Sequence, residues 1–180
     1  MDFVTSDLHF DHAKIIEFGR PYFCTVEEMN QTLIDNWNAV VSETDTTYVL
    51  GDFCWKANKS VEFSYALNGR KVLILGNHDP RNMVKNPAKF GFDEVHSFGI
   101  DLKKVSLCHY PMKEARRKLM IHGHTHGTNQ PIVFTQTPHA KRSYVRANVC
   151  VENWRYTPVR LERLIDMMTS VYEANTGEEL

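Results

Sequence analysis

The stretch "LMIHGHTHG" at residues 119–127 joins a short apolar run to three histidines at alternate positions, His122, His124 and His126. An apolar run of this length that ends at a glycine is typical of a buried β-strand. Histidine-rich tracts also form weak surface sites for metals. The stretch alone therefore does not decide between a surface tract and the ligands of a catalytic metal, and the decision depends on whether the pattern recurs.

The pattern of an apolar run followed at once by polar residues does recur along the chain. Strands are predicted at 2–6, 46–50, 71–75, 104–109, 118–123 and 142–152, where apolar and β-branched residues dominate. Helical spacing of apolar residues predicts a helix over 26–41, with a capping box formed by Thr25 and Glu28.

Two further helices complete the expected order of elements. One is expected over 59–68, and the last begins near Thr157, with Pro158 in its first turn. Strands and helices alternate in the first half, and strands dominate the second. This order predicts an α/β fold in which sheets are covered by helices, built as a single domain over residues 1–180.

Composition limits the possible partners and locations. With 42% hydrophobic and 24% charged residues and a net charge of −1, the chain has the composition of a globular protein without a field that attracts nucleic acid or anionic membranes. The first ten residues lack the basic start of a signal peptide, and no apolar run has the length of a membrane span. The four cysteines form no C-x-x-C pair. We expect a cytoplasmic protein with reduced, mostly buried cysteines.

Polar residues with metal-binding or acid–base chemistry follow five of the expected strands. Carboxyl ends of strands in open α/β sheets are where ligands bind, so these side chains should converge on one crevice. The residues are Asp7 and His9, Asp52, Asn77 with His78 and Asp79, His109, and His124 with His126.

These residues form the ordered motifs D-x-H (7–9), G-D (51–52), G-N-H-D (76–79), a single H (109) and G-H-x-H (123–126). Each short motif occurs by chance in unrelated proteins, but the full ordered set resembles the calcineurin-like metallophosphoesterases, in particular their small bacterial and phage-type members. The resemblance covers about two-thirds of the chain. It implies a four-layered α/β/β/α sandwich with two metal ions at the strand ends.

The resemblance also implies a ligand set. One metal would be held by Asp7, His9, Asp52 and His126, and the other by Asp52, Asn77, His109 and His124, so that Asp52 bridges the pair. His122 would then be structural. Mixed imidazole and oxygen ligands suit divalent transition metals, and we expect Mn, with Fe, Zn, Ni or Co as alternatives.

Catalytic roles follow for two residues of the G-N-H-D motif. His78 would stand beside the substrate and protonate the leaving group. Many members of the family have an acid in the second motif that orients this histidine, whereas this chain has "GDFCWK" at 51–56, with Trp55 at that position. Asp79 is the expected replacement.

The surroundings of the motifs leave alternatives open. Arg20 either clamps a phosphate or caps a surface turn, and Arg116 and Arg117 either bind an anion or merely solvate a loop. The polar segment 126–146 could form a rim over the site, with His139, Lys141 and Arg142 facing the substrate.

The resulting prediction is a phosphoester hydrolase with two metals, acting on a phosphodiester or phosphomonoester such as a small nucleotide or cyclic nucleotide. One alternative is a nuclease acting on DNA or RNA ends, although near-neutral charge disfavours extended nucleic acid. The other alternative is a non-catalytic interaction scaffold, against which the complete ligand set argues. The oligomeric state is not readable from the sequence.

Overall fold

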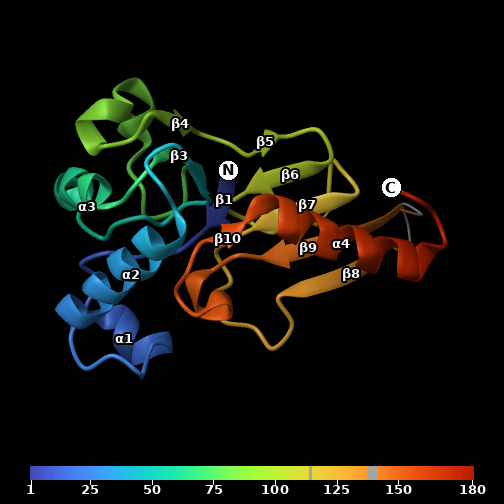
Figure 1. Cartoon of the computed structure of the whole chain (residues 1–180), viewed down its shortest axis with the longest axis horizontal. Coiled ribbons are helices and arrows are strands. Elements are labelled where there is room, and N and C mark those ends of the chain that lie inside the picture. Colours follow the sequence, from blue (N-terminus) through green and yellow to red (C-terminus); the bar gives the residue numbers. More distant parts are fainter. Residues whose placement is uncertain (114, 138–141) are drawn as a thin grey trace.

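The computed structural model describes residues 1–113, 115–137 and 142–180. Its frame is two five-stranded sheets (Figure 1). The first sheet has the order β10 (Val159–Arg160), β1 (Asp2–Thr5), β2 (Thr46–Val49), β3 (Arg70–Ile74) and β4 (Glu94–His96). The second has the order β5 (Ile100–Asp101), β6 (Val105–Cys108), β7 (Leu119–His122), β9 (Arg142–Asn148) and β8 (Ile132–Thr137).

The central strands of both sheets are parallel. β1, β2, β3 and β4 run in one direction, and β10 pairs with β1 in the opposite direction. In the second sheet β6, β7 and β9 are parallel, while the edge strands β5 and β8 are antiparallel. Parallel strands place their carboxyl ends at one edge of each sheet, which is the arrangement that the sequence pattern requires.

Three helices cover one face of the first sheet: α1 (Lys14–Gly19), α2 (Val26–Val40) and α3 (Ser60–Ala66). Leu33 and Trp37 of α2 are fully buried in one apolar cluster with Phe3 and Leu73 of the sheet. The Thr25 hydroxyl accepts a hydrogen bond from the Glu28 amide at 3.1 Å, which is the predicted N-cap of α2.

The opposite face of the first sheet packs on the second sheet. Val4 and Ile74 share a buried cluster with Leu107 and Ile121, and helix α4 (Leu161–Thr176) adds Leu164 to it. Because side chains alternate along a strand, Phe3 and Val4 enter different clusters on the two faces of β1. The two-sheet α/β sandwich expected from the sequence is therefore confirmed.

Short elements account for most departures from the predicted order. The last helix begins at Leu161 rather than near Pro158, because residues 159–160 extend as β10 against β1. In the segment 126–146, for which the sequence suggests a rim over the site, residues 132–137 form β8, and β8 pairs antiparallel with the predicted strand β9. Four 3-10 segments connect other elements: η1 (Ala57–Lys59), η2 (Arg81–Lys85), η3 (Pro87–Phe90) and η4 (Val151–Trp154). Within the described ranges, every helix is too short or too polar to cross a membrane.

Candidate metal centre

The candidate ligands that the sequence places after separate strands come together in two groups. One group contains Asp7, His9 and His126, and the other contains Asp52, His109 and His124; within each group the ligand atoms lie within 4.8 Å of one another. The residues follow β1, β2, β6 and β7, so both sheets contribute. The groups match the division of ligands implied by the sequence motifs.

Asp52 lies between the two groups. Its Oδ2 atom is 3.7 Å from Nε2 of His9 and also 3.7 Å from Nε2 of His109. Oδ1 of Asn77, which follows β3, lies 2.9 Å from Nε2 of His109. These distances place Asp52 where a bridging carboxylate is expected, with Asn77 beside the second group.

The backbone at this site is unusual. Asp7, His9, Asp52, His124 and His126 all have φ between 50° and 69°. Left-handed backbone is uncommon for residues other than glycine, although Asp, Asn and His tolerate it best, and it concentrates at functional sites. The turns after β1, β2 and β7 thus bring carboxylates and imidazoles to the common centre.

Two glycines permit the close approach of these turns. A Cβ atom on Gly76 would contact the Asp52 side chain and lie 2.7 Å from the Asp52 amide nitrogen. A Cβ atom on Gly123 would meet Oγ of Ser6 and lie 2.5 Å from Oδ2 of Asp7. Both distances are too short for carbon, so the glycines of the G-N-H-D and G-H-x-H motifs are steric requirements of the site.

The two oxygens of the buried Asp7 carboxylate differ in their hydrogen bonds. Oδ2 accepts hydrogen bonds from Ser6 Oγ, the His124 amide and Cys150 Sγ. Among the described residues, Oδ1 has no hydrogen-bond partner, and neither has Nε2 of His9. Burial alone would raise the pKa of Asp7, but the neighbouring His9 imidazole and the hydrogen bond from Ser6 outweigh it and hold that pKa below its usual value.

The donor set fits a pair of divalent cations. An unpaired buried carboxylate oxygen and an unpaired buried imidazole nitrogen are costly unless a further partner satisfies them, and a cation is such a partner for Asp7 and His9. Imidazole and carboxylate together, without thiolate, are ligands of transition metals. The three buried cysteines lie outside both groups.

Arg20 and Glu152 form a buried ion pair that contacts His126, a member of the first ligand group. The Arg20 side chain is fully buried, its Nε lies 2.9 Å from Oε1 of Glu152, and it also donates to the carbonyl oxygens of Leu8 and Asp7. Oε1 of Glu152 lies 3.1 Å from Nδ1 of His126. This hydrogen bond raises the pKa of His126. Arg20 is therefore neither a phosphate clamp nor a surface turn residue. It is a buried structural residue that binds Glu152 and the backbone of the loop after β1.

Asp79 occupies a different place from the one expected. Its carboxylate accepts hydrogen bonds from the backbone amides of Asp52 (2.7 Å), Phe53 (3.1 Å) and Gly76 (2.8 Å). Burial raises its pKa, against the effect of these amides. Because both oxygens are engaged by the backbone, Asp79 fixes the loops after β2 and β3 and does not orient the ring of His78.

His78 is partly exposed at the edge of the site. Its side chain is 36% exposed, and Nε2 lies 4.0 Å from Oδ2 of Asp52. The ring lies 5.2 Å from that of Trp55 and 5.3 Å from that of His9, measured between centroids. Trp55 in turn stacks on His12 at 4.0 Å. His78 is thus held by neighbouring rings, and it is accessible to a substrate.

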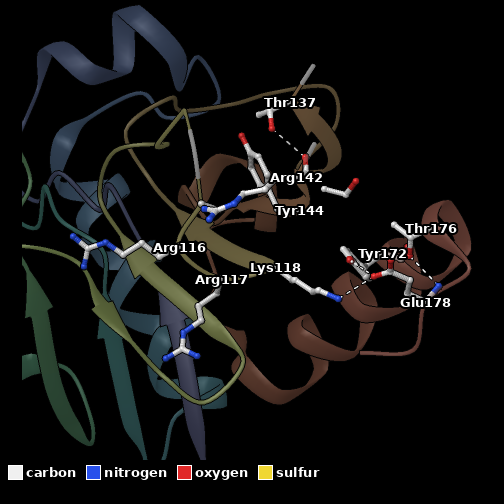
Figure 2. A pocket seen from close by; sticks show the side chains of 11 residues that line it. Arg116, Arg117, Lys118, Thr137, Arg142, Tyr144, Tyr172, Thr176 and Glu178 are labelled. Atoms are coloured by element: carbon white, nitrogen blue, oxygen red, sulfur yellow. Dashed lines mark hydrogen bonds and ion pairs between the residues drawn. The ribbon is translucent and has the colours of Figure 1, made fainter. Parts of the chain in front are cut away.

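The remaining predicted residues lie away from both ligand groups. His122 is buried at the end of β7, and its Nδ1 donates to the carbonyl of Gly123. Arg117 and Arg142 line a separate cavity of about 350 Å³ with Lys118 (Figure 2), and Arg116 lines both this cavity and one that adjoins Asn77 and His109. The first cavity lies at the amino ends of β7 and β9, whereas the candidate ligands follow the carboxyl ends, so Arg142 does not face the site. His139 and Lys141 lie outside the described residues.

The family follows from comparison with known proteins. The model of the calcineurin-like phosphoesterases matches residues 3–154, which includes every candidate ligand. The chain belongs to the calcineurin-like phosphoesterase family. Members of this family use divalent metal ions and are typically phosphoester hydrolases. The two ligand groups are therefore candidate metal sites of a family whose chemistry requires them.

Proteins of similar length resemble nearly the whole chain. Uncharacterized protein MJ1445 of Methanocaldococcus jannaschii is 36% identical, over 92% of this chain and 90% of its own. The Gene 66 protein of Mycobacterium phage L5 is 28% identical, over 94% of each chain. The crystal structure of AQ665 from Aquifex aeolicus, a protein of unknown function, has a TM-score of 0.70 and 30% identity, with 93% of this chain and 98% of that chain covered.

A nuclease shares the fold at lower similarity. Pseudomonas putida nuclease MPE has 22% identity and a TM-score of 0.50, covering 69% of this chain and 61% of its own. At this identity the likeness shows the fold alone.

Sequence reasoning missed one residue of the site, Glu152. It directly follows the apolar run "VCV" at 149–151, and so it shows the same pattern as the candidate ligands. Glu152 has no histidine or glycine beside it, so no motif marks it in the sequence.

Proposed function

We propose that the protein is a phosphoester hydrolase that uses two divalent metal ions and acts on small phosphodiesters or phosphomonoesters. The observation that carries the proposal is the position of Asp52, whose Oδ2 is 3.7 Å from a histidine of each ligand group. A shared carboxylate of this kind offsets the repulsion between two cations at close range. The family assignment supports the same chemistry.

The proposed ligands are those implied by the motifs. Asp7, His9 and His126 would hold one cation, and His109, His124 and Asn77 the other, with Asp52 shared. When bound, two such cations polarise a phosphoryl group and make water a stronger nucleophile at neutral pH. We expect Mn²⁺ to restore activity, with Fe, Zn, Ni or Co as alternatives.

His78 is the proposed proton donor to the leaving oxygen. It is the exposed imidazole at the edge of the site, and its Nε2 lies 4.0 Å from Oδ2 of Asp52. Its backbone amide donates to Oδ1 of Asp52 at 2.9 Å, so its place depends on the shared carboxylate. Asp79 acts only through the loop backbone and is a positioning residue.

Small substrates fit this chain better than extended nucleic acid. The net charge is −1, whereas binding along a nucleic acid backbone relies on many cationic contacts. The fold shared with a nuclease makes a nuclease the alternative to test, and a short single-stranded oligonucleotide assayed beside small esters separates the two functions.

The first test measures metal content and hydrolysis together. Protein stripped with EDTA should regain about two equivalents of Mn²⁺. It should then hydrolyse bis-p-nitrophenyl phosphate or p-nitrophenyl phosphate. His96→Ala should behave like the unchanged protein, because His96 is in neither ligand group and pairs with Glu94 on β4. A protein that binds none of Mn²⁺, Co²⁺, Ni²⁺ or Zn²⁺ and cleaves neither ester would refute the proposal and favour a scaffold.

The second test isolates the role of His78. His78→Ala should keep both metals, since His78 is in neither ligand group. It should lose about 10²–10⁴-fold in kcat on an alkyl or nucleoside ester and much less on a p-nitrophenyl ester, whose leaving group hardly needs a proton. Equal losses on both ester types, or a lower metal content, would assign the proton donor elsewhere.

A further inference from the structure

A cavity of about 710 Å³ lies beside the candidate metal centre. Asn77 and His109 form the wall that it shares with the centre, and residues of both sheets line it. It lies on the side where β4 and β5 are the edge strands of the two sheets. Its volume is in the range of small-molecule sites, roughly 300–1,000 Å³.

The cavity has an apolar floor and an aromatic rim. Ile74 and Leu107 of the floor are almost completely buried, whereas Phe98 and Tyr110 of the rim are 84% and 49% exposed. Phe98 lies in the connection between β4 and β5, and Tyr110 follows His109. Exposed aromatic rings beside a cavity provide faces on which a nucleobase can stack.

Two arginines from separate segments also line this cavity. Arg81 begins η2, and Arg116 precedes β7. Figure 2 shows the guanidinium of Arg116 directed away from Lys118 and Tyr172. Guanidinium groups bind phosphate and carbonyl oxygens and stack on planar rings. An alkyl chain would use the apolar floor but would leave both arginines without a matching group.

We infer that this cavity binds the nucleoside part of a nucleotide ester whose phosphate lies at the metal centre. The base stacks on the rim formed by Phe98 and Tyr110, and Arg81 and Arg116 face its polar oxygens. The inference rests on the proposed hydrolysis for the position of the phosphate. The inference specifies the substrate class of the proposed hydrolase. A phosphate at the metal centre would lie next to this cavity, which has room for a base and a sugar.

Two esters with the same leaving group test the inference. They are the p-nitrophenyl ester of thymidine 5′-monophosphate and ethyl p-nitrophenyl phosphate, assayed with the Mn²⁺-loaded protein. We expect the thymidine ester to have the higher kcat/KM. Phe98→Ala should lower that value by about 5–150-fold, the range measured for loss of base stacking. It should leave the ethyl ester unchanged.

A blocking variant and a matched control sharpen the comparison. Ser97 is an exposed cavity residue, so Ser97→Trp should obstruct the cavity without disturbing the core and should act like Phe98→Ala. Phe18 is 78% exposed on α1, away from the cavity, and Phe18→Ala should change neither ester. Equal losses on both esters in the cavity variants, or faster cleavage of an octyl than of the thymidine ester, would overturn the inference.

A binding measurement separates this inference from the proposed activity. Thymidine 5′-monophosphate titrated into EDTA-treated protein should shift the amide NMR signals of Phe98, Gly99 and Tyr110, and Ser97→Trp should weaken the response. Shifts confined to other regions, or none, would overturn the inference. If the wild-type protein cleaves neither ester, the proposed hydrolysis fails, and this titration alone decides the cavity.

Discussion

Replacing Arg20 with methionine should destabilise the protein far more than the same replacement at a surface ion pair. Arg20 is fully buried, and its guanidinium donates hydrogen bonds to Glu152 and to the carbonyl oxygens of Leu8 and Asp7. Methionine fills a similar volume but leaves the Glu152 carboxylate buried without its cation. Removing one partner of a buried pair typically costs about 3–5 kcal/mol. For a chain of this length each kcal/mol lowers Tm by about 2–4 °C, so we expect a fall of roughly 6–20 °C.

Arg70 provides the matched control. Its pair with Glu94 has a similar distance, 2.8 Å, but both side chains are 46% exposed. Exposed pairs contribute about 0.2–1 kcal/mol, so Arg70→Met should lower Tm by less than about 4 °C. Unfolding is followed by circular dichroism in urea and on heating, at pH 7 with EDTA present, so that metal binding does not contribute.

A double variant tests whether the loss of stability comes from leaving the Glu152 carboxylate buried without a cation. Combining Arg20→Met with Glu152→Met removes both charges and should recover part of the loss, because an apolar pair no longer strands a buried carboxylate. The reasoning is refuted if Arg20→Met is as mild as Arg70→Met, or if the double variant is as unstable as the two single losses added together. Intact Tm with weakened substrate binding would restore the phosphate-clamp interpretation.

Two more results are expected from single measurements. Calorimetric titration with Mn²⁺ should show both sites damaged in Asp52→Asn and neither in His122→Ala; the reverse pattern would contradict the ligand assignment. Ellman's reagent at pH 8 should modify one thiol of the folded protein, the exposed Cys24, and four after denaturation in guanidinium, because burial raises the pKa of Cys54 and of Cys108 to about 12. Rapid reaction of more than one thiol in the folded state would show that these pockets open.

The main elements and the convergence of the motifs were predictable because they depend on patterns that the sequence displays locally. An apolar run such as 72–75 must be buried, and the parallel pairing of its strand with β2 brings Asp52 and Asn77 to one edge. Short elements were not predictable in this way. Val159 and Arg160 form a strand only because the edge of β1 is available to pair with them.

The supporting contacts of the site depend on tertiary structure and have no local signature. Arg20 and Glu152 are 132 residues apart, and nothing near Arg20 in the sequence marks it as buried. Asp79 adjoins His78 in the chain, which favoured a contact between their side chains. The structure directs the carboxylate of Asp79 to backbone amides instead, since three unpaired amides converge on it.

Asp52 explains why the G-D and G-N-H-D motifs form one structural unit. Its Oδ1 accepts the amide of His78, its own amide donates to Asp79, and Oδ2 remains directed at both ligand groups. A Cβ atom on Gly76 would push these two loops apart. The backbone of His78 is therefore fixed relative to the Asp52 carboxylate, and its ring lies beside those of Trp55 and His9. This arrangement places the proposed proton donor beside the candidate metal centre even though Trp55 stands where many members of the family have an acid.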